Sequence, residues 1–216
     1  MSNEQLTSAD RYFTDEEDRR YSGDRLVFFS DAVIAIAMTL LALELPVPRG
    51  RTNAEVWRSF VDLLPAEYLN FVISFAVIAV FWIAHHQFFR KIHAVSGGLR
   101  WLNIGWLFLV VLVPFATRVN SAGDDLVLGP TLYAIVICLL AVLLMLMAWH
   151  AGRAGLLRPD TPPHAMRQLL VGAGAAALVF LVSIPVSVAS PSWGRTVWVL
   201  TILARLLARR LVRRRG

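Results

Sequence analysis

The sequence predicts an all-α, polytopic membrane protein with six transmembrane helices. Of its 216 residues, 57% are hydrophobic, and they fall in long blocks rather than alternating with polar residues. At about 1.5 Å of rise per helical residue, a block of about 20 residues spans the roughly 30 Å hydrocarbon core of a bilayer. The arginines lie beside these blocks, and the size allows one compact helical bundle.

The apolar blocks give the expected spans. We expect them at residues 25–45, 67–89, 99–119, 129–150, 164–189 and 193–212, after a polar tail at 1–24 and before a basic end at 213–216. Asp24 can cap the first helix, and Pro46 ends it. The 129–150 span is almost wholly aliphatic, so we expect it to face lipid.

A short amphipathic helix is expected between the first two spans. Thr52-Asn-Ala-Glu55 resembles a capping box, and apolar residues follow it at helical spacing. This helix is expected to lie on the membrane surface at the outer interface.

Charge predicts the topology. With six spans and a cytosolic N-terminus, 16 of the 21 Lys and Arg residues lie on the cytosolic side and five lie outside. This is the positive-inside bias, and a five-span chain would export the six-arginine C-terminal cluster. We therefore expect both termini in the cytosol. The chain has a net charge of +6, and its basic residues lie beside the expected membrane segments. This placement favours anionic lipid over nucleic acid as a partner.

The first span combines an apolar stripe with a polar edge. At about 100° per residue, one line through Ile36 collects seven residues: Phe29, Ala32, Val33, Ile36, Thr39, Leu40 and Leu43. Ser30 and Asp31 lie well off that line. Most membrane helices carry such stripes on a lipid-facing or core surface, so the stripe alone predicts no pore.

Ionisable Asp31 needs a partner inside the membrane. Arg25 is six positions away and poorly placed on the same helix. Trp82 and His86 stand four apart on one face of the second span, near the same end, and are natural partners for Ser30 and Asp31. Such a network fixes helix packing in its simplest interpretation.

These residues carry a family resemblance. Arg25, Phe29-Ser30-Asp31, Ala35-Ile36-Ala37 and Thr39-Leu40-Leu41 resemble the first-helix signature of prokaryotic members of the transmembrane protein 175 family of potassium channels. The resemblance implies a homotetramer in a prokaryotic plasma membrane, with the first helices lining a central pore. It implies that Ile36 and Leu43 form constrictions, that Thr39 forms a polar layer between them, and that Leu40 lies near the lining.

The same resemblance groups the polar residues into one network. Its members are Arg25, Phe29, Ser30, Asp31, Trp82, His86 and Asn103. The permeant ion is expected to be potassium, with no cofactor. The sequence has no TVGYG-like carbonyl filter, so we expect modest selectivity.

Other functions stay open. A secondary transporter or proton pathway would use Asp31 and His86 as groups that change protonation, and a structural or signalling membrane protein would not conduct at all. His85-His86 lacks the i, i+4 spacing of a zinc-binding helix face, so a metal site is not expected. No nucleophile with a base and orienting group is evident, and the sequence does not predict an enzyme.

Overall fold

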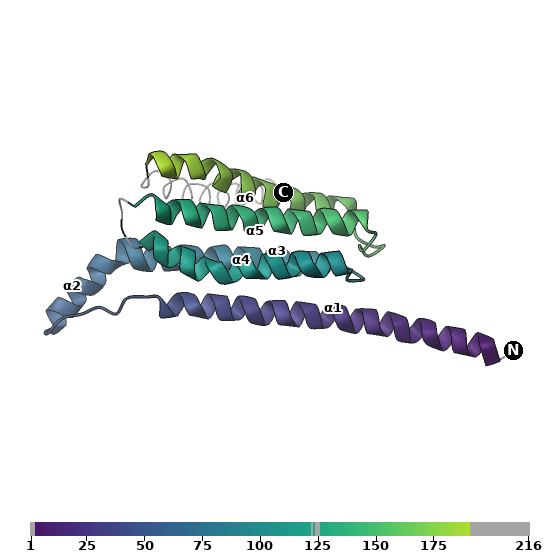
Figure 1. The fold of residues 1–216 in the computed structure, drawn as a ribbon. Coiled ribbons are helices and arrows are strands. Elements are labelled where there is room, and N and C mark those ends of the chain that lie inside the picture. The colour runs from purple at the N-terminus through teal and green to yellow at the C-terminus, as the bar shows by residue number, and fades with distance from the viewer. Residues whose placement is uncertain (1–2, 122, 124–125, 191–216) are drawn as a thin grey trace, which may run out of the picture.

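The computed structural model describes residues 3–121, 123 and 126–190. The described chain is all-helical and forms an elongated bundle (Figure 1). Its helices are α1 (Asn3–Leu43), α2 (Asn53–Leu63), α3 (Leu69–Phe89), α4 (Gly97–Ser121), α5 (Leu128–Arg153) and α6 (Pro163–Ala189), with a π-helical turn, η1 (Leu64–Tyr68), between α2 and α3. The expected span at 193–212 and the basic end at 213–216 lie outside the described residues.

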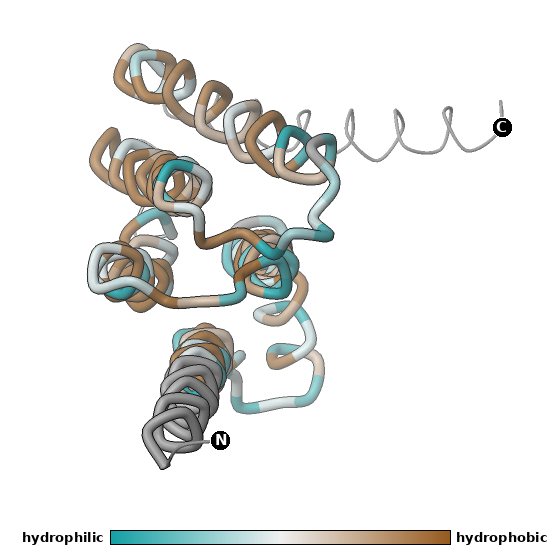
Figure 2. Tube along the Cα trace, turned by 90° about the vertical axis from the view of Figure 1, so that its right-hand side faces the viewer, coloured by the Kyte–Doolittle hydropathy of each residue, from teal (hydrophilic) through white to brown (hydrophobic). Residues whose placement is uncertain are grey.

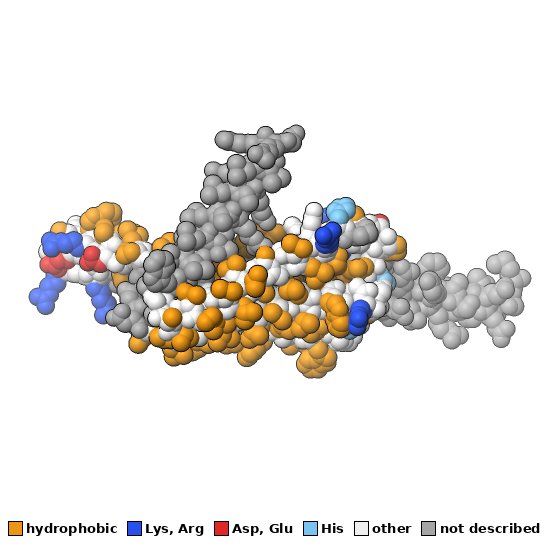
Figure 3. All heavy atoms as spheres, turned by 90° about the horizontal axis from the view of Figure 1, so that it is seen from above, with side chains coloured by type: hydrophobic (Ala, Val, Ile, Leu, Met, Phe, Trp, Pro, Cys, Tyr) orange, Lys and Arg blue, Asp and Glu red, His pale blue; other side chains and the backbone are white. Residues whose placement is uncertain are grey.

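Five of these helices contain stretches long and apolar enough to cross a membrane. They are Gly23–Leu43, Leu69–Phe89, Gly97–Ser121, Leu128–Arg153 and His164–Ala189. Figure 3 shows hydrophobic side chains along the α6 side of the bundle, with basic side chains near its two ends. This distribution matches a body immersed in hydrocarbon with its cations at the interfaces.

The bundle is layered. Viewed along the helices, α1 lies on one side, α3, α4 and α5 form the middle, and α6 lies on the opposite side (Figure 2). The most extensive contacts join α5 to α4 and to α6. α1 packs on α3 and α4.

The expectation that the 129–150 span faces lipid is wrong. α5 lies between α4 and α6 and buries more of its length than any other spanning helix that the structure describes. Ala134, Ala141 and Ala148, seven residues apart, are fully buried. Small side chains let neighbouring backbones approach closely, so an aliphatic helix with this pattern packs inside the bundle.

α1 begins at Asn3, well before its membrane-spanning stretch. The first 45 residues contain no proline, and the helix continues through Gly23. Asp24 therefore lies within the helix and does not cap it, contrary to expectation. α1 ends at Leu43, ahead of Pro46, which cannot extend a helix.

α2 is the expected short helix between the first two apolar stretches. The Thr52 hydroxyl accepts a hydrogen bond from the Glu55 backbone N–H (3.3 Å), and the Glu55 carboxylate accepts one from the Arg51 N–H (2.7 Å). This differs from a strict capping box only in that the carboxylate bonds the residue before the N-cap. No α2 residue is buried. The turn η1, which contains Pro65, follows α2, and α3 begins after it at Leu69.

Candidate functional site

α1 presents two opposite faces. Ser30, Ile34, Ala37 and Leu41 are buried, at the spacing of one helical face. The opposite face is uncovered: Ile36 is 58% exposed and Leu43 is 80% exposed, while Phe29, Thr39 and Leu40 are also exposed. The stripe predicted from the sequence therefore faces away from the other described helices.

Thr39 supplies the only hydroxyl on the exposed stripe. Its Oγ1 donates a hydrogen bond to the carbonyl oxygen of Ile36, one turn back (2.8 Å). A hydroxyl whose proton is held by the helix backbone keeps its lone pairs for another partner. The Thr39 oxygen can therefore still accept from, or coordinate, a second partner on this face.

A buried polar chain joins α1 to α4 and α3. The Ser30 hydroxyl donates to the Leu26 carbonyl (2.8 Å), and the Asn103 Nδ2 donates to the Ser30 Oγ (2.9 Å). The Asn103 Oδ1 lies 2.8 Å from the His85 Nε2. Ser30, His85 and Asn103 are fully buried. With the Asn103 amide oriented this way, His85 Nε2 carries the proton and donates it.

The buried chain ends at His85, which the sequence analysis did not place in the network, and not at His86. His85 shares the inner face of α3 with Ile78 and Phe81, and its ring stacks on Trp106 of α4 at 4.6 Å. His86 lies about 100° further round the helix, and its Nδ1 is buried without a hydrogen-bond partner in the described structure. The expectation that His86 is a partner of Ser30 is therefore wrong: Asn103 is the side-chain partner of Ser30, and His85 is the partner of Asn103.

Asp31 forms a hydrogen bond with Trp82, the tryptophan expected from the sequence. The Trp82 Nε1 donates a hydrogen bond to the Asp31 Oδ1 (2.9 Å). The Trp82 ring lies 5.9 Å from the His86 ring, so His86 adjoins this pair through the indole. Arg25 and Phe29 are exposed on α1. The network therefore divides into a buried part at Ser30 and a half-exposed part at Asp31.

A second polar cluster, which the sequence analysis did not assign, lies nearer the other end. The Thr117 hydroxyl lies 2.8 Å from the Ser74 Oγ, which lies 3.3 Å from the Tyr133 hydroxyl. All three are buried, and they join α3, α4 and α5. Single hydroxyls on separate apolar helices give no spacing signal, so only tertiary packing brings them together.

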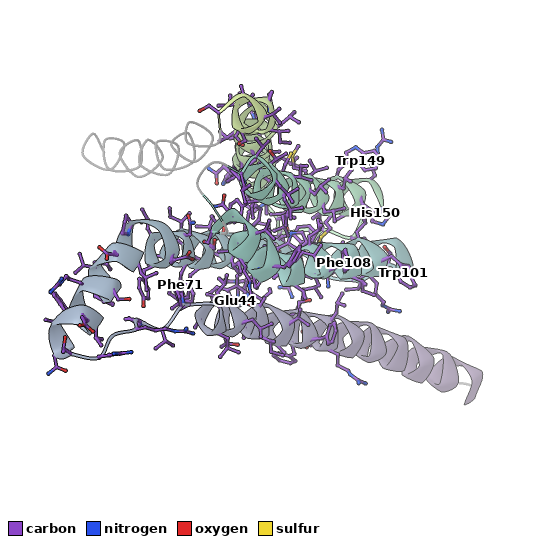
Figure 4. The ribbon with its side chains drawn as sticks, turned by 60° about the vertical axis from the view of Figure 1, so that its left-hand side comes forward. Glu44, Phe71, Trp101, Phe108, Trp149 and His150 are labelled. Carbon is purple, nitrogen blue, oxygen red and sulfur yellow. The ribbon has the colours of Figure 1, made fainter. Side chains whose placement is uncertain are left out.

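A salt bridge joins the segment just after α1 to α4. The Arg118 guanidinium lies 2.7 Å from the Glu44 carboxylate. Glu44 lies at the end of the helix nearest α2 (Figure 4). Both side chains are substantially exposed, so the pair orients this end more than it stabilises it. No group of three or more potential metal ligands occurs within the described ranges.

The sequence is similar to a family of known proteins. The family model described as "Endosomal/lysosomal potassium channel TMEM175" matches residues 25–114, which hold both parts of the network. A potassium channel from Streptomyces collinus is 33% identical over 148 residues, covering 64% of this chain and 70% of that one. This chain belongs to the TMEM175 family. A Chryseobacterium potassium channel is 39% identical over 44% of this chain, but that match covers only 46% of the relative.

A solved TMEM175 structure has the same fold. The crystal structure of a lysosomal potassium-selective channel TMEM175 homolog from Chamaesiphon minutus matches with a TM-score of 0.73 at 27% identity, covering 88% of this chain and 98% of that one. Vertebrate TMEM175 relatives, 24% identical in zebrafish and human, are named endosomal/lysosomal proton channels. These names describe channels, in agreement with the prediction that this chain is not an enzyme.

Proposed function

We propose that this chain is a subunit of a homotetrameric, potassium-permeable channel in a prokaryotic plasma membrane. Four α1 helices surround the axis, with Ile36 and Leu43 as constrictions, Thr39 as a polar layer between them and Leu40 near the lining. One α1 cannot enclose a pore, whereas four copies related by a closed rotation can. Potassium is the permeant ion, and no cofactor is required.

The observation that carries the proposal is the pair of faces on α1. Its polar edge is fastened to α3 and α4 through Ser30 and Asp31, so the exposed stripe is held in a fixed direction. A bulky aliphatic ring can exclude water from an axis, and a hydroxyl ring can replace part of the hydration of a cation. Membership of a family described as potassium channels supports the same use of the stripe.

Potassium flux tests this function. We expect purified protein in liposomes to dissipate a potassium gradient without any coupled ion, because a channel needs none. The readout is potassium-driven membrane potential followed with a voltage-sensitive dye. Flux that depends on a second ion would instead identify a secondary transporter, and flux equal to that of empty liposomes would identify a protein that does not conduct.

A proton pathway is the second candidate, because vertebrate TMEM175 relatives are named proton channels. In this alternative, Asp31 and His86 change protonation during transport. Asp31→Asn separates the two candidates, since the amide oxygen still accepts from Trp82 while the titratable group is gone. We expect normal assembly and normal potassium flux. Loss of proton flux, measured with an enclosed pH dye at fixed potassium, would establish the proton pathway.

The proposed topology places both termini in the cytosol. A cysteine introduced by Gly216→Cys in a Cys138→Ser background is expected to resist an impermeant maleimide in intact cells and to react after lysis. The comparison variant is Arg51→Cys, in the connection between α1 and α2, which is expected to react from outside. The reverse labelling pattern would exclude six spans with an internal N-terminus.

A further inference from the structure

A cavity lies at the end of the bundle where the spanning part of α1 begins. Its volume is about 520 Å³, and it is partly open to the surroundings. α1, the end of α3 and the connection between α5 and α6 each contribute to its walls. The apolar part of the lining is formed by Val27, Phe28, Phe89, Ile92 and Pro162.

Backbone hydrogen bonds hold the two connecting segments of this cavity together. The Arg158 N–H donates to the Lys91 carbonyl (2.8 Å), and the His93 N–H donates to the Leu156 carbonyl (3.0 Å). Ile92 and Leu157 thereby form an isolated antiparallel bridge. Segments more than 60 residues apart in sequence are fixed side by side, and their cations are gathered at one place.

The charged lining has an excess of cations. Arg90, Lys91 and Arg158 line the cavity together with Asp24 and Asp160. Within the described part of the chain, none of these three cations forms a salt bridge. The Lys91 ammonium donates to the Gln87 carbonyl (2.8 Å), and partial burial together with the neighbouring Arg90 charge lowers the pKa of Lys91. An anion in the cavity would offset this unfavourable electrostatic environment.

The position of the cavity relative to the membrane-spanning stretches indicates which kind of anion it binds. Arg90 and Lys91 follow directly after the membrane-spanning stretch Leu69–Phe89, and Asp24 lies at the start of Gly23–Leu43. Residues at the ends of spans lie at the level of lipid headgroups. Cations beside an apolar wall at this level match a molecule with a phosphate head and hydrocarbon chains better than they match a free phosphate ion.

We propose that this cavity binds an anionic phospholipid, with Arg90 and Arg158 contacting the headgroup phosphate. Both guanidinium groups are exposed, and their planar forks suit phosphate oxygens. Phe28 and Phe89 accommodate the first part of the acyl chains. Because the cavity has walls on α1 and on the α5–α6 connection, the bound lipid links the two.

Native mass spectrometry of the full chain in detergent tests the site. The probes are phosphatidylglycerol, which is anionic, and phosphatidylcholine, which is zwitterionic, each with identical acyl chains. Wild type is expected to prefer phosphatidylglycerol. Removing one interfacial cation weakens binding of an anionic lipid about fivefold, so Arg90→Gln/Arg158→Gln is expected to lose most of the bound phosphatidylglycerol.

The matched control is Arg153→Gln/Arg167→Gln. Both arginines are exposed at the same end of the bundle, but neither lines the cavity. This variant loses the same charge and is expected to bind phosphatidylglycerol nearly as wild type does. Equal losses in the two double variants would overturn the site, because the effect would then be general surface charge.

Two further results bear on the proposal. Arg90→Lys/Arg158→Lys keeps the charge and is expected to retain much of the binding. Retained binding would show that the loss in the glutamine variant follows from the lost charge and not from a folding defect caused by removing the arginines. Equal uptake of the two lipids by wild type would overturn the proposal. Displacement of phosphatidylglycerol by an equal concentration of glycerol 3-phosphate would overturn the lipid assignment in favour of a soluble phosphate. No arm of this test depends on ion conduction.

Discussion

Asn103→Leu is expected to destabilise the folded chain and reduce the yield of its assembled form. Asn103 is fully buried, and its amide donates to Ser30 and accepts from His85. Leucine fills a similar volume but leaves the His85 Nε2–H without an acceptor, at a cost of about 1 to 3 kcal/mol. Thermal unfolding in detergent and gel filtration measure the two effects.

Asn120→Leu is the matched control for Asn103→Leu. Asn120 lies in the same helix and is also buried, but its Oδ1 has no hydrogen-bond partner in the described structure. Its replacement therefore breaks no bond at that oxygen, and we expect a smaller loss of stability. If the two leucine variants lose the same stability, packing volume and not the Ser30–Asn103–His85 chain accounts for the effect.

A second substitution should rescue Asn103→Leu. His85→Phe removes the unpaired donor, and a phenyl ring can keep the stacking on Trp106 that the imidazole makes at 4.6 Å. Replacing both polar partners by apolar groups of similar shape is close to neutral. The double variant His85→Phe/Asn103→Leu is therefore expected to be more stable than Asn103→Leu alone. The Ser30 hydroxyl keeps its own bond to the Leu26 carbonyl.

Contiguous apolar blocks and a local capping pair made much of the fold predictable. The blocks of apolar residues end within a few residues of five apolar helical stretches that are long enough to cross a membrane, and Thr52 with Glu55 predicted the start of α2. The orientation of α5 was not predictable in the same way, because a helix that is aliphatic all round carries no asymmetry that separates lipid from protein. Its buried alanines at 134, 141 and 148 were the available signal.

The polar site was predictable in its composition but not in its pairing. Trp82 could be matched to Asp31 because both lie near the same end of neighbouring spans, and the structure places them in contact. His85 and His86 differ by about 100° in direction, and only the rotation of α3 about its axis decides which one faces Asn103. The sequence alone does not fix that rotation. The Ser74–Thr117–Tyr133 cluster depends on three such rotations at once.

Ile36→Ala is expected to raise single-channel current and weaken the preference for potassium over sodium. In the proposed tetramer, four Ile36 side chains form a dry ring that a hydrated cation enters without a compensating ligand. Alanine widens and wets that ring, so a partly hydrated sodium ion also passes. The control is Ile83→Ala on α3, because Ile83 is 47% exposed, near the 58% of Ile36, and lies on another helix. Its current is expected to match that of wild type.

Thr39→Val tests the polar layer next to that ring. Valine keeps the branched shape of threonine and deletes the oxygen, whose proton is held by the Ile36 carbonyl and whose lone pairs stay available to a cation. Selectivity is therefore expected to fall more than current changes, whereas Thr39→Ser keeps the hydroxyl and should retain the preference for potassium. Planar-bilayer recordings under bi-ionic potassium and sodium give both quantities for each variant. Current and reversal potential unchanged in both Ile36→Ala and Thr39→Val would place the stripe against lipid, where truncation of Ile36 removes only about 1 kcal/mol of packing.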